Sequence, residues 1–198
     1  MAEVRHGWVA PHVAGELLGL GIASIEAEVP GGRSPEGVRK RLRYLSDRFH
    51  GADALQMRER PVPWAYRVLF RQIGIDPDVV RTPVEALALR RLHDGGFKSR
   101  GRLADALTIG TADTGVALRA LDAATLVGDL GIREAAPGEP FAAGSLVIAD
   151  ERAPVAPLFG GEDDVPSASR AAIVAVHPGG VPEMTVDEAL QAAATSLA

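Results

Sequence analysis

The 198-residue chain contains no cysteine. It therefore has no disulfide framework, no thiolate metal ligands and no cysteine nucleophile. Histidine is also scarce, and no two of the five histidines stand three or four residues apart, the spacing that places two imidazoles on one face of a helix. We expect no metal site in this protein, and nothing in the sequence indicates another cofactor.

Long apolar runs are absent as well. The longest, such as Ala142 to Ala149, fall far short of the roughly 20 residues needed to span a bilayer. No uninterrupted apolar stretch precedes Glu16, so the start of the chain is not typical of a signal peptide. A hydrophobic fraction of 46% with 24% charged residues is typical of a soluble globular protein. We predict one cytoplasmic domain, residues 1–198, with no membrane partner.

The common catalytic loop motifs are missing too. The glycines form isolated pairs and no phosphate-binding loop, and no Gly-x-Ser-x-Gly nucleophile elbow occurs. These absences exclude the sequence signatures of nucleotide-binding loops and of serine hydrolases with that elbow.

The distribution of charge is more informative than the net charge of −5. From Arg33 to Arg102 the chain carries 16 Lys or Arg and 8 Asp or Glu, a net of +8, whereas all other residues together carry −13. Clustered positive charge favours a polyanionic partner, because each neutralised phosphate releases a condensed counterion. The alternative is that these side chains lie on solvated helix faces and pair with local acids.

The first half of the chain carries helix signals. Ser34 and Pro35 are suited to a helix start, and apolar residues follow at spacings of four, three and four through Phe49. Thr82-Pro83-Val84-Glu85 is a capping box, and Gly95 marks the end of that helix. Further helices are predicted over Trp64 to Ile73 and Leu103 to Thr111, and a last one is capped at Thr185.

Strand signals dominate the second half, after an earlier β-rich run from Leu17 to Val29. Short apolar segments separated by Pro, Gly and acidic turns predict strands. They are Val116 to Leu121, Asp129 to Arg133, Ser145 to Ala149, Val155 to Phe159 and Ala172 to His177, with a hairpin turn at Glu151 to Pro154. Helices mainly first and strands mainly later predict an α+β domain.

Three aromatic residues, Trp64, Tyr66 and Phe70, lie among arginines. Aromatics interleaved with arginine are suited to stacking bases and holding phosphates. At helical spacing, Tyr66 and Phe70 also fit a core stripe with their apolar neighbours. The basic residues that we predict to contact RNA are Arg60, Arg67, Arg71, Arg90, Arg91, Lys98, Arg100 and Arg102.

An ordered set of short motifs runs through the middle of the chain. It comprises Gly96-Phe97-Lys98-Ser99-Arg100-Gly101-Arg102-Leu103-Ala104-Asp105, Asp113-Thr114-Gly115, Leu118-Arg119-Ala120-Leu121-Asp122, Gly131-Ile132-Arg133-Glu134-Ala135, Gly138-Glu139 and Leu146-Val147-Ile148-Ala149-Asp150. In order and spacing this set resembles the editing domain of the beta subunit of bacterial phenylalanyl-tRNA synthetase, the tRNA-binding B3/B4 domain. The resemblance is strongest over residues 64–161, and its upstream part looks like stand-alone relatives of that domain.

The resemblance implies a fold, a partner and a reaction. The fold is an unusual β-sandwich or mixed sheet with flanking helices. The partner is tRNA or aminoacyl-tRNA, and no DNA is expected. The reaction is hydrolysis of the ester of mischarged tRNA, which in the synthetase carries tyrosine in place of phenylalanine, by a positioned water without a covalent protein nucleophile.

The resemblance also implies three substrate-pocket residues. Gly96 matches a small pocket-lining glycine, and Asp113 matches a glutamate that recognises the tyrosine hydroxyl. Asp105 matches the aspartate of an Asn-Asn-x-x-Asp stretch whose asparagines are replaced here by Gly101 and Arg102. Considered alone, Asp113 before Thr-Gly is also an ordinary helix-end or turn residue.

Three functional interpretations follow. The protein binds tRNA and hydrolyses mischarged aminoacyl-tRNA in trans; or it is a non-catalytic RNA-binding module; or it binds an amino acid or another small molecule in the old editing pocket. The acidic net charge favours the third interpretation. The amino acid, the tRNA and the oligomeric state do not follow from the sequence.

Overall fold

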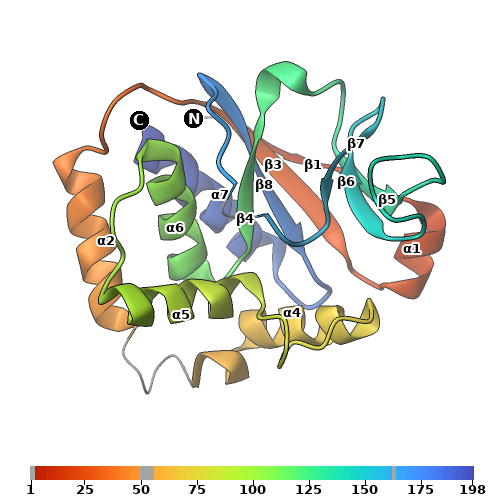
Figure 1. Ribbon diagram of the computed structural model, residues 1–198, viewed down its shortest axis with the longest axis horizontal. Helices are drawn as coiled ribbons and strands as arrows, with labels where there is room; N and C mark the ends of the chain where they lie inside the picture. Colours follow the sequence, from red (N-terminus) through yellow and green to blue (C-terminus); the bar gives the residue numbers. More distant parts are fainter. Residues whose placement is uncertain (1–2, 50–55, 162–163) are drawn as a thin grey trace.

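The computed structural model describes residues 3–49, 56–161 and 164–198. These residues form six α-helices and two four-stranded open sheets, which confirms the predicted α+β class (Figure 1). Among them, no helix is both long and apolar enough to cross a membrane. The helices are α1 (Pro11–Glu16), α2 (Glu36–Arg48), α4 (Pro61–Gln72), α5 (Pro83–Asp94), α6 (Arg102–Thr114) and α7 (Glu183–Leu197).

The first sheet is antiparallel throughout and has the order β1-β3-β8-β4. Its strands are β1 (Val4–His6), β3 (Gly21–Glu28), β8 (Arg170–His177) and β4 (Leu118–Asp122). The central strand β8 consists of alanine, valine and isoleucine between its end residues, and all six of those residues are buried. A strand that is apolar on both faces needs a cover on each side.

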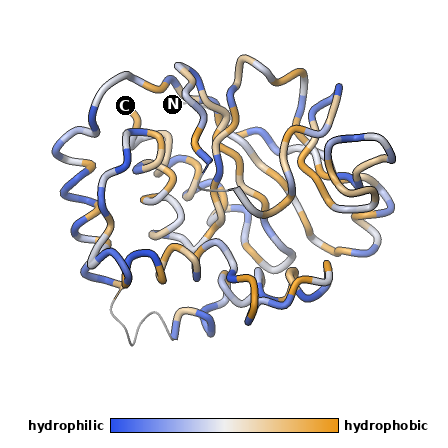
Figure 2. The backbone as a smooth tube through the Cα atoms, in the orientation of Figure 1, coloured by the Kyte–Doolittle hydropathy of each residue, from blue (hydrophilic) through white to orange (hydrophobic). Residues whose placement is uncertain are grey.

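The two faces of β8 divide the core into two parts. Because side chains alternate along a strand, Ala171, Ile173 and Ala175 point to one face, where they pack with residues of α6 and α7. Val174 and Val176 point to the other face, where they pack with residues of the second sheet. The first sheet therefore lies between a helical layer and the second sheet. Figure 2 shows the hydrophobic residues concentrated along these strands, whereas α2 at the edge is largely hydrophilic.

The second sheet has the order β2-β5-β6-β7. Its strands are β2 (Trp8–Val9), β5 (Gly131–Glu134), β6 (Leu146–Ala149) and β7 (Pro154–Pro157). The pair β2–β5 is parallel and the others are antiparallel. Glycine is required at position 131, because a Cβ atom there would lie 2.0 Å from the indole ring of Trp8. The hairpin predicted at Glu151 to Pro154 joins β6 to β7 and is confirmed.

The helices follow the sequence signals with some corrections. The Thr82 capping box opens α5, and Gly95 closes it with a φ of 73°. Ser34 was predicted to cap α2, and this is wrong. The helix begins one residue later, at Glu36, with Pro35 at the cap position. The last helix begins at Glu183, ahead of the predicted cap at Thr185. The sequence patterns did not predict β1, β2 and α1, which have three, two and six residues.

Candidate functional site

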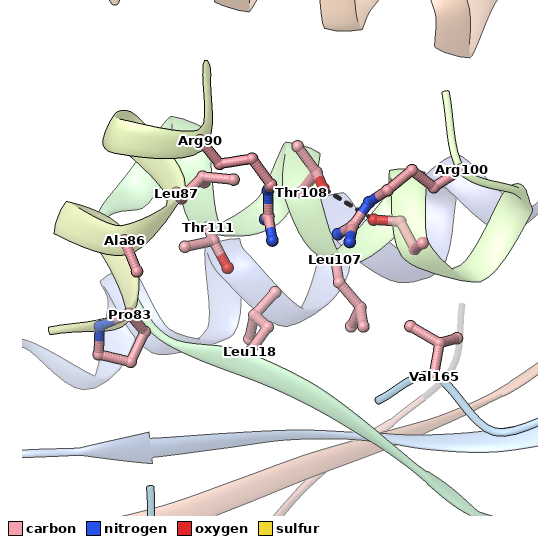
Figure 3. A pocket seen from close by; sticks show the side chains of 11 residues that line it. Pro83, Ala86, Leu87, Arg90, Arg100, Leu107, Thr108, Thr111, Leu118 and Val165 are labelled. Atoms are coloured by element: carbon pink, nitrogen blue, oxygen red, sulfur yellow. Dashed lines mark hydrogen bonds between the residues drawn. The ribbon is translucent and has the colours of Figure 1, made fainter. Parts of the chain in front are cut away.

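A pocket lies between α5, α6 and β4, on the helical side of the first sheet (Figure 3). The pocket is partly open to solvent and has a volume of about 70 Å³. The walls combine apolar side chains with two guanidinium groups and two hydroxyl groups. The lining residues are Pro83, Ala86, Leu87, Arg90, Arg100, Ala104, Leu107, Thr108, Thr111, Leu118 and Val165.

Arg90 and Arg100 reach over the pocket from opposite sides, as Figure 3 shows. Arg90 comes from the last turns of α5, and Arg100 from the loop that precedes α6. The Thr111 hydroxyl points toward the pocket in the same view, whereas the Thr108 hydroxyl donates to the Ala104 carbonyl at 2.8 Å. The pocket therefore presents positive charge and hydroxyl groups above an apolar floor, a combination that suits an anionic or carbonyl-bearing group.

Asp105 fixes the loop that carries Arg100. Its side chain is buried in the first turns of α6 and accepts hydrogen bonds from the Ser34 hydroxyl at 2.6 Å and the Ser99 hydroxyl at 2.5 Å. It also accepts one from the Arg100 backbone N–H at 2.8 Å. A carboxylate near a helix N-terminus is favoured by the helix dipole. Asp105 thus holds the backbone beside the pocket, and it is not itself a lining residue.

A buried ion pair anchors α5 to α4. The Arg67 side chain is 4% exposed and donates to Glu85 at 2.8 Å and to Asp78 at 2.6 Å. Burial opposes its charge, but the hydrogen bond to Asp78 and the charges of Glu85 and Asp78 outweigh burial and raise the pKa of Arg67. Glu85 also accepts from the Thr82 backbone N–H in the capping box. This network sets the position of Pro83, which lines the pocket one residue after Thr82.

The structure places the other two predicted pocket residues elsewhere. Asp113 lies in the last turn of α6. Both of its carboxylate oxygens accept from one Arg41 nitrogen, at 2.7 and 2.8 Å, and one of them also accepts from Arg48 at 3.5 Å. It therefore ties α6 to α2. Gly96 follows α5 with a φ of 151° and lies near Ser46. Neither residue lines the α5–α6 pocket, whereas Asp105 lies beside it.

The basic residues predicted to contact RNA separate into distinct environments. Arg90 and Arg100 line the pocket. Arg91 donates through Nε to the Ser46 carbonyl at 2.9 Å, and Arg67 is held inside the protein by its ion pairs. We therefore leave Arg67 out of any RNA-contacting surface. The remaining predicted residues are exposed or half-buried: Arg60, Arg71, Lys98 and Arg102.

Sequence reasoning missed the two threonines of the pocket. Thr108 and Thr111 stand three residues apart on a helix that is otherwise almost entirely apolar and buried from Leu103 to Ala112. This spacing places both threonines on one helix face, since residues three apart on a helix are neighbours. Nothing in the sequence pattern alone distinguishes them from β-branched core residues.

A larger cavity of about 490 Å³ opens between α1, the end of α4 and the second sheet. Its lining is mainly apolar, and its two charged residues are Glu16 and Glu134, both acidic. Phosphate groups are repelled by such a rim, so this cavity does not suit a nucleic acid. Among the described residues, no cluster of three His, Asp or Glu side chains is placed to hold a metal ion.

Comparison of the chain with protein-family models, with curated proteins and with solved structures gives no match. We therefore base the proposed function on the α5–α6 pocket and its surroundings.

Proposed function

We propose that this protein binds RNA, and that the α5–α6 pocket receives the aminoacylated end of a tRNA. The observation that carries this proposal is the pair Arg90 and Arg100 over a pocket with an apolar floor. Guanidinium groups bind phosphate oxygens in two-pronged geometry, and the floor offers a place for an amino-acid side chain. The sequence resemblance to the editing domain, with its sandwich and flanking helices, supports the same proposal.

The size of the pocket points to a small amino acid. A pocket volume of about 70 Å³ is about half that of the roughly 150 Å³ protein cavity that accommodates benzene. A tyrosine or phenylalanine ring therefore exceeds this space and would extend through the open side of the pocket, whereas alanine, serine or glycine side chains fit within it. We propose aminoacyl groups with small side chains as the ligand class, in place of the tyrosine that the resemblance implied.

The lining also constrains the chemistry of ester hydrolysis. The lining residues that the structure describes include no carboxylate and no imidazole, and arginine does not act as a base because its guanidinium group has donors and no acceptor. Hydrolysis in this pocket would therefore use a bound water, with the guanidinium groups stabilising the oxyanion that develops on the ester. The water oxygen bonds to the ester carbon, the bond from that carbon to the ribose oxygen breaks, and a proton of the water passes to the departing ribose oxygen. This device needs no covalent nucleophile. We propose it as the catalytic mechanism of trans-hydrolysis of mischarged aminoacyl-tRNA.

Binding and release of the amino acid are measured together in the deciding experiment. A panel of tRNAs charged with alanine, serine, glycine, tyrosine and phenylalanine is incubated with the wild type, Arg90→Gln, Arg100→Gln and Thr111→Val. We expect each arginine variant to weaken binding by about tenfold, since hydrogen bonds to charged groups contribute about 1.5 kcal/mol or more. We expect the wild type to release small amino acids faster than buffer does, and Thr111→Val to slow that release.

Arg152→Gln is the matched control, because it removes the same charge from an exposed position in the β6–β7 hairpin. Equal affinity in both pocket variants and this control would contradict the pocket as the binding site. Binding without release on any ester would remove hydrolysis and leave a non-catalytic RNA-binding module.

A second candidate is a binder of small free amino acids that makes no RNA contact. The net charge of −5 and the small pocket volume favour it. Calorimetric titration with free alanine, serine and glycine tests it directly, since this candidate requires saturable binding in the absence of any RNA. Loss of that binding in Arg100→Gln would place the ligand carboxylate against the guanidinium.

A further inference from the structure

Helix α4 carries aromatic residues on two opposite faces. Tyr66 and Phe70 point inward and are buried, so the predicted core stripe is confirmed for them. Trp64 points outward and is 51% exposed, and Val68, one turn later, is exposed as well. Trp side chains are on average highly buried. The half-exposed indole of Trp64 therefore differs from a typical tryptophan and offers a flat ring at the surface of α4.

Arginine completes this outer face. The Arg71 guanidinium lies 5.8 Å from the centroid of the Trp64 ring, seven residues and about two helical turns further along. Arg60 caps the N-terminus of the same helix and is also exposed. Arg71 has a weak contact of 3.9 Å to the exposed Asp78. The outer face of α4 thus holds the flat ring of Trp64 with the Arg71 guanidinium over it, and the Arg60 guanidinium at the N-terminus of the helix.

This combination suits one kind of ligand. An unpaired base stacks on an aromatic face or a guanidinium plane, and its phosphate pairs with a neighbouring arginine. Bases inside a duplex are already stacked on one another and do not offer that face. The same α4 is tied to α5 by the Arg67–Glu85 ion pair, and Figure 1 shows the two helices one after the other along the lower edge. The ion pair therefore links the helix that carries Trp64 to a helix that lines the pocket.

We propose that Trp64 and Arg71 form a binding site for an unpaired nucleobase of single-stranded RNA. This inference rests on the proposed RNA binding and adds to it a second contact point outside the pocket. A tRNA supplies unpaired bases at its 3′ end and in its loops, so the α4 site extends the interface beyond the terminal nucleotide. Trp64 contributes the stacking surface, Arg71 the adjoining guanidinium plane, and Arg60 a phosphate contact.

Tryptophan fluorescence tests this site directly, since the chain has only two tryptophans. In a Trp8→Phe background the signal comes from Trp64 alone. Titration with a 12-nucleotide oligouridine is expected to quench that signal, and an RNA duplex of 12 base pairs is expected to quench it far less. In filter binding, Trp64→Ala should weaken oligouridine binding by about fivefold to a hundredfold, the range for loss of one base–aromatic stack.

Matched variants distinguish stacking from loss of apolar surface. Trp64→Phe keeps a ring and should retain most of the affinity, and Arg71→Lys keeps the charge but loses the planar group and should weaken binding. Met184→Ala removes an exposed apolar side chain from α7 and should change nothing. Unchanged circular dichroism confirms that each variant is folded.

The outcomes separate this inference from the proposed function. If tRNA binds and depends on Arg90 and Arg100 while Trp64 shows no quenching and Trp64→Ala binds equally well, the α4 site is wrong and the pocket stands. If quenching occurs equally with duplex and single strand, the ligand is not an unpaired base and the inference fails. If the wild type binds no RNA at all, both the proposed function and the α4 site are wrong.

Discussion

At the scale of single residues, Asp105 shows how a residue of a sequence motif can position another residue by its hydrogen bonds. Its buried carboxylate satisfies two serine hydroxyls and the Arg100 backbone N–H, so it joins the loop after β3 to the loop before α6. The resemblance selected this residue as a pocket residue. The structure places it beside the pocket, as the group that positions Arg100.

Removing the Asp105 carboxylate should destabilise the protein and loosen the pocket. Asp105→Ala leaves buried hydroxyl and N–H donors without a partner, and each unsatisfied buried group costs about 1–3 kcal/mol. We expect the free energy of unfolding to fall by about 3 kcal/mol in urea denaturation. Asp105→Asn, which keeps the shape and one acceptor oxygen, should lose clearly less. Equal losses in the two variants would show that the charge, and not the acceptor geometry, matters.

A pH-dependent contribution to stability is expected from Glu139. Hydrogen bonds from Arg133, at 2.6 and 2.8 Å, and from the Ala136 backbone lower the pKa of Glu139 from 4.5 to about 2. A folded-state pKa below the unfolded value stabilises the fold above pH 4.5, and this contribution is lost as the pH falls toward 2. The difference in unfolding free energy between the wild type and Glu139→Gln should therefore shrink over that window. A difference that stays constant from pH 6 to pH 2 would contradict the assignment.

Residue environments were the least predictable part of the site. Arg67 and Asp113 both looked available in the sequence, but their partners lie 18 and 72 positions away. Whether an arginine contacts RNA or a buried glutamate depends on packing between elements, which local composition does not encode. The hydroxyls of Thr108 and Thr111 were missed for the same reason.

At the scale of elements, prediction succeeded where the signal is local. The capping box of α5, the apolar spacing of α2 and the short apolar runs of β5, β6 and β8 each lie within one element, so the sequence contains them. The short strands β1 and β2 carry too few residues for periodicity, and β2 exists because it pairs with β5 more than a hundred residues later. Their formation depends on the assembled sheets.

The contact between α6 and α7 depends on Gly110. A Cβ atom there would lie 2.4 Å from Leu118 Cδ1 and 2.7 Å from the Ala189 carbonyl oxygen. Although alanine favours helices, Gly110→Ala should destabilise the protein by about 1–3 kcal/mol because the packed helices must separate. Gly37→Ala is the matched control in α2, where a Cβ atom meets nothing within 4 Å. It should stabilise by about 0.5 kcal/mol, and thermal unfolding distinguishes the opposite signs.

At the scale of the whole molecule, positive charge is concentrated in one continuous segment of the chain, residues 33–102. Helices α2, α4 and α5 belong to the segment with the net charge of +8 and lie along one side and the lower edge in Figure 1. The remainder of the chain carries −13, including the two glutamates of the larger cavity. A chain with an acidic net charge therefore carries a basic group of helices, which is the part that we propose to contact RNA.

The salt dependence of tRNA binding tests the central claim most directly. The affinity of alanine-charged tRNA is measured from 50 to 300 mM KCl for the wild type, Arg90→Gln, Arg100→Gln and the control Arg152→Gln. If Arg90 and Arg100 bind phosphates, the logarithm of the affinity falls linearly with the logarithm of the salt concentration, and each pocket variant reduces the slope by about one. No measurable binding at 50 mM, or the same slope in the pocket variants as in the wild type, would contradict an RNA-binding pocket between α5 and α6.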